Sequence, residues 1–200
     1  MQVLSFNTGI DFGAKGNLKE FDPVGFSAGP DDVSTWSEAS VAELSFRLPP
    51  LRHDVRFSIE VFPYLAEGAI PRQGCFVYFN GLFVHYQSVR TPLELTFTVA
   101  RDLLNPRGNR LLFALPDATA PKDLNLGDDL RLLGLSFVKL TAGPPGAPAP
   151  RQAEAESQVD TPVGRPTEDG QQRAGARNQP AGDRNQPAGP APGGLPRPPR

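Results

Sequence analysis

The chain has 200 residues and a formal net charge of −2 at pH 7, with 20 Lys and Arg against 22 Asp and Glu. This balance excludes the overall basic field with which proteins bind nucleic acid or acidic membranes. The single cysteine, Cys75, excludes an intrachain disulfide, and we interpret it as an inert buried thiol because it lies in an apolar run.

The sequence shows neither a signal-peptide pattern at its N-terminus nor the roughly 20 consecutive apolar residues that a membrane-spanning helix needs. As written, the chain is therefore expected to be cytoplasmic, with no insertion into a membrane. This expectation changes if the chain is a fragment of an envelope protein.

Composition divides the chain near residue 142. Every Phe, Tyr and Trp lies before this position, whereas residues 142–200 are rich in Pro and Gly. Such a segment cannot bury enough apolar surface to offset the entropy lost on ordering it. We therefore predict a folded domain over residues 1–141 and a disordered Pro/Gly-rich tail over residues 142–200.

Alternation of apolar and polar residues with period two predicts strands along the first 141 residues. A weak edge strand is expected near Val3–Phe6, and the alternation is clear in residues 41–50, 54–63 and 93–99. Residues 109–116 and 134–141 are more apolar than the other segments, as central strands are. With a hairpin at 75–87 this gives about eight strands separated by turn residues, which predicts an all-β fold, an antiparallel β-sandwich of jelly-roll type.

The hairpin sequence CFVYFNGLFVHYQ contains an Asn-Gly pair, the strongest short-range signal for a two-residue turn. A uniform register from this turn pairs Phe79 with Leu82, Tyr78 with Phe83, Val77 with Val84, Phe76 with His85 and Cys75 with Tyr86. Side chains alternate across a strand, so the core face is expected to contain Cys75, Val77, Phe79, Leu82, Val84 and Tyr86. The outer face then carries Phe76, Tyr78, Phe83 and His85.

Three interpretations of this outer face stay open. Cross-strand aromatic pairs stabilise a sheet by themselves. An apolar patch can also be covered by another protein or domain. Finally, an exposed ring can stack on the apolar face of a pyranose while polar neighbours bind its hydroxyl groups. The only tryptophan, Trp36, is either a further stacking residue or a half-buried ring packed against a loop.

Patterns for catalysis and metal binding are lacking in the sequence. The two histidines, His53 and His85, belong to no Cys/His cluster with metal-ligand spacing. The segment GAKGN at 13–17 lacks the Gly-Lys-Ser/Thr ending of a phosphate-binding loop. No pair of nucleophile and base can be recognised either. We therefore expect no metal and no cofactor, and we predict that the chain is not an enzyme.

A polar stretch before the last predicted strand places Arg131 among leucines and close to Asp128 and Asp129. A charged side chain beside a core is tolerated only when it is paired. We therefore expect Arg131 to bond one of these two carboxylates and to act as a structural lock for the loop.

Several ordered segments resemble a known domain. They are IDFGAKGN, GFSAGPDDVSTWSEASVAELSFRLP, VRFSIEVFPYL with RQGCFVYFNGLFV, and LLFALPDATAPKDLNLGDDLRLLGLSFVKL. Over residues 8–141 this series resembles the jelly-roll-like β-sandwich accessory domain appended to bacterial glycosyltransferases and related cell-envelope polymer enzymes. The resemblance implies a non-catalytic module linked to bacterial surface-glycan biosynthesis, with a glycan or a glycosyltransferase domain as its partner. The alternative function is a structural or protein-interaction domain that docks through its aromatic outer face.

Overall fold

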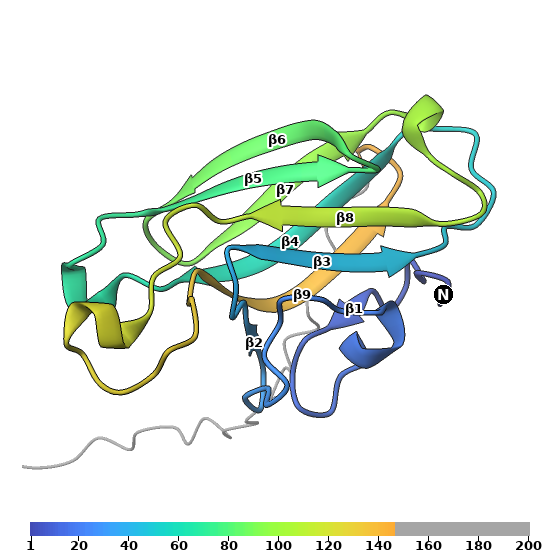
Figure 1. Cartoon of the computed structure of the whole chain (residues 1–200). Helices are drawn as coiled ribbons and strands as arrows, with labels where there is room; N and C mark the ends of the chain where they lie inside the picture. The colour runs from blue at the N-terminus through green and yellow to red at the C-terminus, as the bar shows by residue number, and fades with distance from the viewer. Residues whose placement is uncertain (147–200) are drawn as a thin grey trace, which may run out of the picture. The chain divides into compact units, whose positions relative to one another are not determined.

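The computed structural model describes residues 1–146, so the predicted tail from residue 147 on lies outside the described part. Nine β-strands form two antiparallel sheets packed face to face (Figure 1). This confirms the predicted antiparallel β-sandwich, with nine strands in place of about eight. Helical structure in residues 1–146 is limited to 3-10 turns of three or four residues, and no helix there could cross a membrane.

The first sheet has the order β1-β9-β4-β7, with β2 also paired to β9. Its strands are β1 (Ile10–Asp11), β2 (Thr35–Trp36), β4 (Val55–Pro63), β7 (Leu93–Val99) and β9 (Leu135–Gly143). The second sheet has the order β3-β8-β5-β6 and faces the viewer in Figure 1. Its strands are β3 (Val41–Phe46), β5 (Gln73–Phe79), β6 (Leu82–Val89) and β8 (Asn109–Ala114). The 3-10 turns are η1 (Leu18–Phe21), η2 (Ala66–Gly68), η3 (Arg101–Leu103) and η4 (Pro121–Leu124).

The strand pairs are nested along the chain. Strand β5 pairs with β6, β4 with β7, β3 with β8, and β2 with β9. The chain therefore behaves as a long hairpin that is folded at the β5–β6 turn and rolled into two layers. This is the jelly-roll arrangement that the sequence predicts.

Strand ends differ from the prediction where alternation gives no signal. The expected edge strand near Val3–Phe6 is reduced to a single bridge between Val3 and Arg47. The two-residue strand β1 was not predicted, because two residues cannot display a period. Strand β9 runs to Gly143, so the predicted domain boundary at residue 141 falls inside it.

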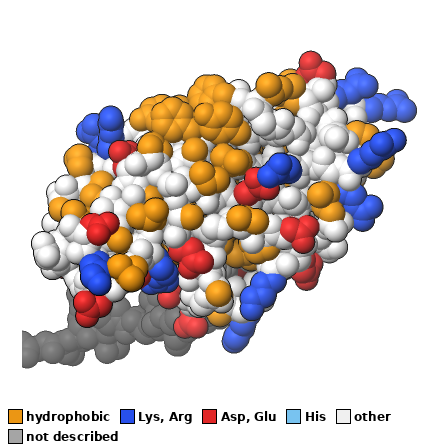
Figure 2. Space-filling model, viewed as in Figure 1, with side chains coloured by type: hydrophobic (Ala, Val, Ile, Leu, Met, Phe, Trp, Pro, Cys, Tyr) orange, Lys and Arg blue, Asp and Glu red, His pale blue; other side chains and the backbone are white. Residues whose placement is uncertain are grey.

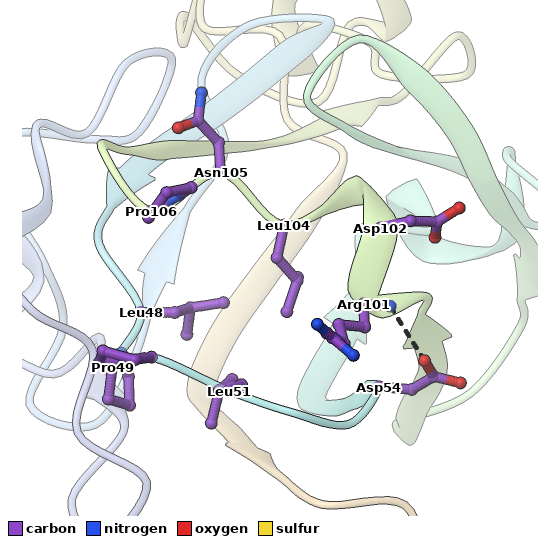
Figure 3. A pocket seen from close by; sticks show the side chains of 10 residues that line it. Leu48, Pro49, Leu51, Asp54, Arg101, Asp102, Leu104, Asn105 and Pro106 are labelled. Atoms are coloured by element: carbon purple, nitrogen blue, oxygen red, sulfur yellow. Dashed lines mark hydrogen bonds between the residues drawn. The ribbon is translucent and has the colours of Figure 1, made fainter.

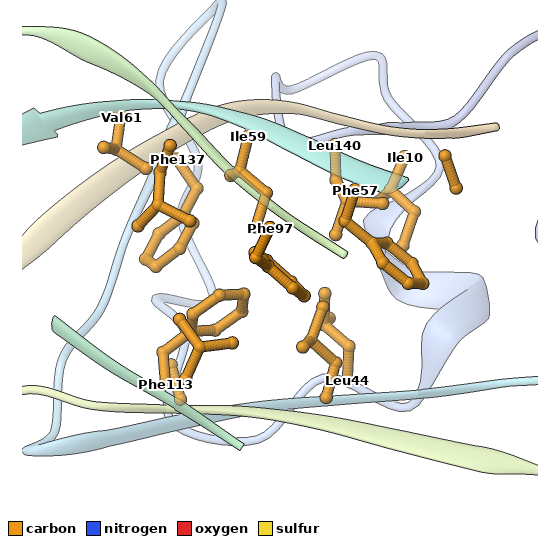
Figure 4. Packing of buried hydrophobic residues seen from close by; sticks show 14 of the residues in the cluster. Ile10, Leu44, Phe57, Ile59, Val61, Phe97, Phe113, Phe137 and Leu140 are labelled. Carbon is orange, nitrogen blue, oxygen red and sulfur yellow. The ribbon is translucent and has the colours of Figure 1, made fainter. Parts of the chain in front are cut away.

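The alternating apolar residues of both sheets meet in one core (Figure 4). Phe57 of β4 lies near its centre, with ring centroids 5.3 Å from Phe97, 5.7 Å from Phe79 and 6.1 Å from Phe46. These partners come from both sheets, so Phe57 joins the two layers. Interdigitation of this kind is how a sandwich buries the inner faces of its sheets.

Replacing Phe57 by alanine should lower the free energy of unfolding by about 3–5 kcal/mol, because the cavity left behind cannot collapse between two sheets. Chemical denaturation of the purified chain measures this loss. Phe62→Ala is the matched control, since Phe62 lies on the same strand but is exposed on the outer face. Equal losses for the two variants would contradict the packing described above.

Candidate functional site

The turn between β5 and β6 is built by Asn80 and Gly81, which both have positive φ, 51° and 83°. These are the conformations that a two-residue hairpin turn requires. The Asn80 side chain also fastens the turn to its surroundings. Its Nδ2 donates to the Leu103 carbonyl oxygen at 2.8 Å, and its Oδ1 accepts the Arg110 amide at 2.9 Å.

The predicted register of the hairpin holds for only two pairs. Phe79 faces Leu82 and Tyr78 faces Phe83, but Val77 faces His85 instead of Val84. Val84 is therefore an extra residue in β6, which forms a β-bulge. A shift of one residue moves every following side chain to the other face of the sheet.

The bulge reverses the predicted places of His85 and Tyr86. His85 faces the core, where its ring stacks on Phe97 of the other sheet with a centroid distance of 6.1 Å. Tyr86 faces outward beside Phe76, with a centroid distance of 4.7 Å. The prediction of a core position for Tyr86 and an outer position for His85 was wrong, because the pattern of apolar and polar residues in this strand does not indicate an inserted residue. Leu82, also predicted in the core, is exposed at the end of the hairpin.

Four aromatic side chains form one cluster on the outer face of β5 and β6. This outer aromatic surface consists of Phe76, Tyr78, Phe83 and Tyr86. The centroids of Phe76 and Phe83 lie 6.4 Å apart, and those of Tyr78 and Phe83 lie 5.8 Å apart. Phe83 is 56% exposed and Tyr86 is 41% exposed. Figure 2 shows hydrophobic side chains gathered over β5 and β6 on this face.

Neighbouring strands extend this surface and give it a polar border. Leu112 of β8 lies directly beside Tyr78, and Glu43 of β3 lies beside Leu112. Side chains at directly paired positions share one face of a sheet. Tyr78, Leu112 and Glu43 therefore form a row across the outer face, from aromatic to aliphatic to charged.

Glu43 is held by Arg110 of β8 through two hydrogen bonds. Arg110 Nε donates to Oε1 at 2.8 Å and Nη2 donates to Oε2 at 2.6 Å. The Arg110 side chain is 67% exposed, whereas that of Glu43 is 13% exposed. A guanidinium has five N–H groups, so three donors of Arg110 are not used by Glu43.

A hollow of about 880 Å³ lies next to Tyr78 at this end of the sheet. Tyr78, Leu112, Glu43 and Arg110 line it on the sheet, and residues 102–106, which begin within η3, line it as well. An aromatic ring, an aliphatic side chain and a guanidinium–carboxylate pair therefore border the same space. Pockets for small ligands commonly combine apolar walls with a few polar groups in this way.

The opposite end of the outer aromatic surface is also polar. Asp117 Oδ2 accepts the Gly74 amide at 2.7 Å. A Cβ atom at position 74 would lie 3.1 Å from the same Asp117 oxygen, so the glycine gives this carboxylate room to approach the backbone. The Ser88 hydroxyl, on the neighbouring strand, is buried and has no hydrogen-bond partner within the described residues.

A second hollow, of about 610 Å³, lies at the end of the sandwich (Figure 3). Leu48, Leu51 and Leu104 point into it, and the Arg101 amide donates to Asp54 Oδ1 at 2.9 Å. None of the residues that line it is aromatic. This hollow therefore lacks a surface for ring stacking and is a weaker candidate for a sugar site.

Trp36 lies apart from the outer aromatic surface. It belongs to β2 in the other sheet and packs edge-on against Tyr64, with a centroid distance of 6.1 Å. Of the five predicted ligand-binding residues, the structure thus brings Phe76, Tyr78 and Phe83 together and separates His85 and Trp36 from them.

Sequence reasoning missed the residues that complete this surface. The pairing of β3 with β8, which places Glu43 near Arg110, joins positions 67 residues apart in the chain. A single sequence carries no signal for such a pair, because each of the two residues only marks the polar side of its own strand.

Arg131 bonds Asp129 and not Asp128. Its Nη2 lies 2.6 Å from Asp129 Oδ2, and its Nη1 donates to the Ser27 hydroxyl at 3.2 Å. The side-chain hydrogen bonds from Arg131, followed by its backbone amide, lower the pKa of Asp129 to about 2. Burial, and then the carboxylates of Asp129 and Glu67, raise the pKa of nearby Tyr64.

The described residues offer no obvious catalytic group. Cys75 is buried in the core, and burial raises the pKa of its thiol to about 12, so the reactive thiolate is disfavoured. Within residues 1–146, no group of three or more His, Cys, Asp or Glu side chains is placed to hold a metal ion. Gly16 in GAKGN has a packing role, because a Cβ there would lie 2.1 Å from the Asp11 carbonyl oxygen.

Comparison with known proteins gives only distant likenesses. No protein-family model matches the sequence, and no curated protein matches it. The carbohydrate-binding module CBM36, solved in complex with calcium and xylotriose, is 12% identical with a TM-score of 0.33, over 60% of this chain and 86% of that chain. A family 35 carbohydrate binding module from an environmental isolate is 12% identical with a TM-score of 0.34, over 70% of this chain and 90% of that chain. At these TM-scores neither likeness bears on what this chain binds.

The ion pair at Asp129 makes a testable prediction about acid stability. The folded-state pKa of Asp129 lies below the usual value of about 4 for an aspartate. The ionised Asp129 side chain therefore stabilises the fold above about pH 4, and this stabilisation is lost as the pH falls through about 2. Arg131→Ala and Asp129→Asn should both lower the melting temperature at pH 7, and the deficit should shrink below about pH 3. Asp128→Asn is the control. An unchanged melting curve for Arg131→Ala would contradict the lock.

Proposed function

We propose that this chain is a carbohydrate-binding module and that a pyranose stacks on Tyr78 of the outer aromatic surface. The observation that carries the proposal is the row of Tyr78, Leu112 and Glu43 beside a hollow, with Arg110 bonded to Glu43. An aromatic ring can bind the apolar face of a sugar, and the adjoining charged pair can bind its hydroxyl groups.

The mutual orientation of the rings favours one sugar ring over a flat ribbon of several. Phe76 and Tyr86 are inclined at 48° to each other, and Tyr78 and Phe83 at 68°. Rings inclined in this way do not form one plane on which a crystalline polysaccharide could lie. Each ring can offer its face to one sugar unit at most.

The charges around the hollow favour a neutral ligand. Glu43 and Asp102 contribute two carboxylates, whereas Arg110 contributes one guanidinium. The net negative charge would repel a uronic acid or a phosphorylated sugar. Hydroxyl groups, in contrast, can accept from the unused donors of Arg110 and donate to the Glu43 carboxylate.

The association with bacterial surface-glycan biosynthesis, and with a glycosyltransferase domain as partner, is a further part of this proposal. It is supported by the sequence resemblance of residues 8–141. In this role the module would hold a neutral envelope glycan while a separate catalytic domain acts on it.

A second candidate function is docking to another protein through the same surface. The exposure of Leu82 and Phe83 at the hairpin end supports it, because exposed apolar side chains that lie together commonly mark a protein contact. Under this alternative Glu43 and Arg110 would be incidental to binding.

Calorimetric titration with a panel of neutral oligosaccharides tests the glycan function. Tyr78→Ala should weaken binding about tenfold or more, whereas Tyr78→Phe should largely retain it, because stacking needs the ring. Arg110→Gln should weaken binding less severely. Trp36→Ala serves as a control that removes an aromatic ring from the other sheet. Equal affinities of Tyr78→Ala and the unaltered chain, or no binding of any neutral glycan, would overturn the proposal.

A further inference from the structure

Strand β6 forms one edge of the second sheet. It pairs with β5 on one side only, and Figure 1 shows it along the upper margin with no described strand beyond it. An edge strand presents main-chain N–H and C=O groups that have no partner in the sheet. Another strand that approaches from this side can bond to them.

The edges of the two sheets differ in how they are protected. The free side of β3 is covered, since Val24 and Glu43 exchange main-chain hydrogen bonds of 3.0 and 2.9 Å and the Leu4 amide donates to the Arg47 carbonyl at 2.9 Å. Strand β7 carries Glu94 on its outer face, and a charge on an edge discourages pairing. In contrast, β6 is eight residues long and contains neither a charged residue nor a proline, and beyond its bulge at Val84 it pairs regularly with β5 from His85 to Val89.

We propose that β6 pairs antiparallel with β6 of a second copy of this chain. Such a pairing joins two four-stranded sheets into one continuous sheet. A two-fold axis brings the same strand from both copies together, so the interface must be self-complementary. An uncharged strand meets this condition, because no like charges come to lie opposite each other.

Charges at the two ends of β6 are complementary in this arrangement. Arg90 follows the C-terminal end of β6, whereas Asp102 lines the same hollow as Gly81 and Leu82 at the N-terminal end. In an antiparallel pair, the C-terminal end of one strand lies beside the N-terminal end of its partner. Arg90 of each copy would therefore approach Asp102 of the other, at both ends of the interface.

The hydrogen-bond pattern identifies a main-chain group that is available for pairing. The Gly74 amide donates to the Asp117 side chain and so points away from β6. Gly74 and Ser88 are directly paired, which makes them a pair without main-chain hydrogen bonds between β5 and β6. The Ser88 amide consequently points to the free side of β6.

Pairing through β6 would also enlarge the ligand-binding face. A two-fold axis between antiparallel strands of one sheet is perpendicular to the sheet, so both outer faces look to the same side. Phe83 and Tyr86 of the two copies would then lie on either side of the seam. If the proposed sugar site operates, the dimer would present two such sites on one surface, which raises the avidity for a long glycan.

Sedimentation equilibrium of the full chain over a wide concentration range tests the dimer. Ser88→Pro removes the outward amide and leaves the hydrogen bonds to β5 in place. We therefore expect the dimer dissociation constant of this variant to be about tenfold or more above that of the unaltered chain. Ser88→Lys should act in the same direction by placing a charge at the interface. Thr98→Lys, an equal change of charge on β7, is the matched control and should leave the dimer intact.

Circular dichroism establishes that each variant is folded before its dimerisation is compared. An unaltered chain that stays monomeric up to its solubility limit would overturn the proposal. Equal dimer dissociation constants for Ser88→Lys and for the control Thr98→Lys would overturn it too. Neither result depends on whether the chain binds a sugar, so this test and the titration of Tyr78→Ala can fail separately.

Discussion

The outer face of the second sheet depends on a single inserted residue, Val84. Without this bulge the hairpin would place His85 among the outer rings and Tyr86 in the core. With it, an imidazole packs against Phe97 between the sheets, and the fourth outer ring is a tyrosine beside Phe76. Bulges commonly re-aim side chains near functional sites, and this one decides which chemistry the surface can offer.

The sequence was sufficient to predict the two-sheet architecture and the buried faces of several strands, but not the register of the β5–β6 hairpin. Alternation identified the faces of β3, β4 and β7 because each buries one side on a shared core. The Asn-Gly turn was recognised because few other residue pairs adopt two successive positive φ values. The bulge could not be predicted, since Val84 suits a uniform register and a bulged one equally well by composition.

The charged residues beside the candidate site show a second limit of prediction from a single sequence. Glu43 and Arg110 each look like an ordinary solvent-facing residue of an alternating strand. Only the pairing of β3 with β8 makes them one bidentate unit next to Tyr78. A predicted aromatic cluster thus gained polar neighbours from strands that are remote in sequence. The Arg131 pair was easier to foresee, because its carboxylate partner is two residues away in the chain.

The nested order of strand pairs has a consequence for how the chain folds. The β5–β6 hairpin closes the shortest loop, and each further pair, from β4–β7 to β2–β9, encloses all the earlier ones. The entropic cost of closing a loop grows with the length of the segment enclosed. Each inner pair shortens the loop that the next outer pair must close, so pairing is easiest from the hairpin outward. We therefore expect the hairpin that carries the outer aromatic surface to form first and the pairing of β2 with β9 to form last. A topology dominated by distant contacts of this kind folds slowly, on a timescale of milliseconds to seconds.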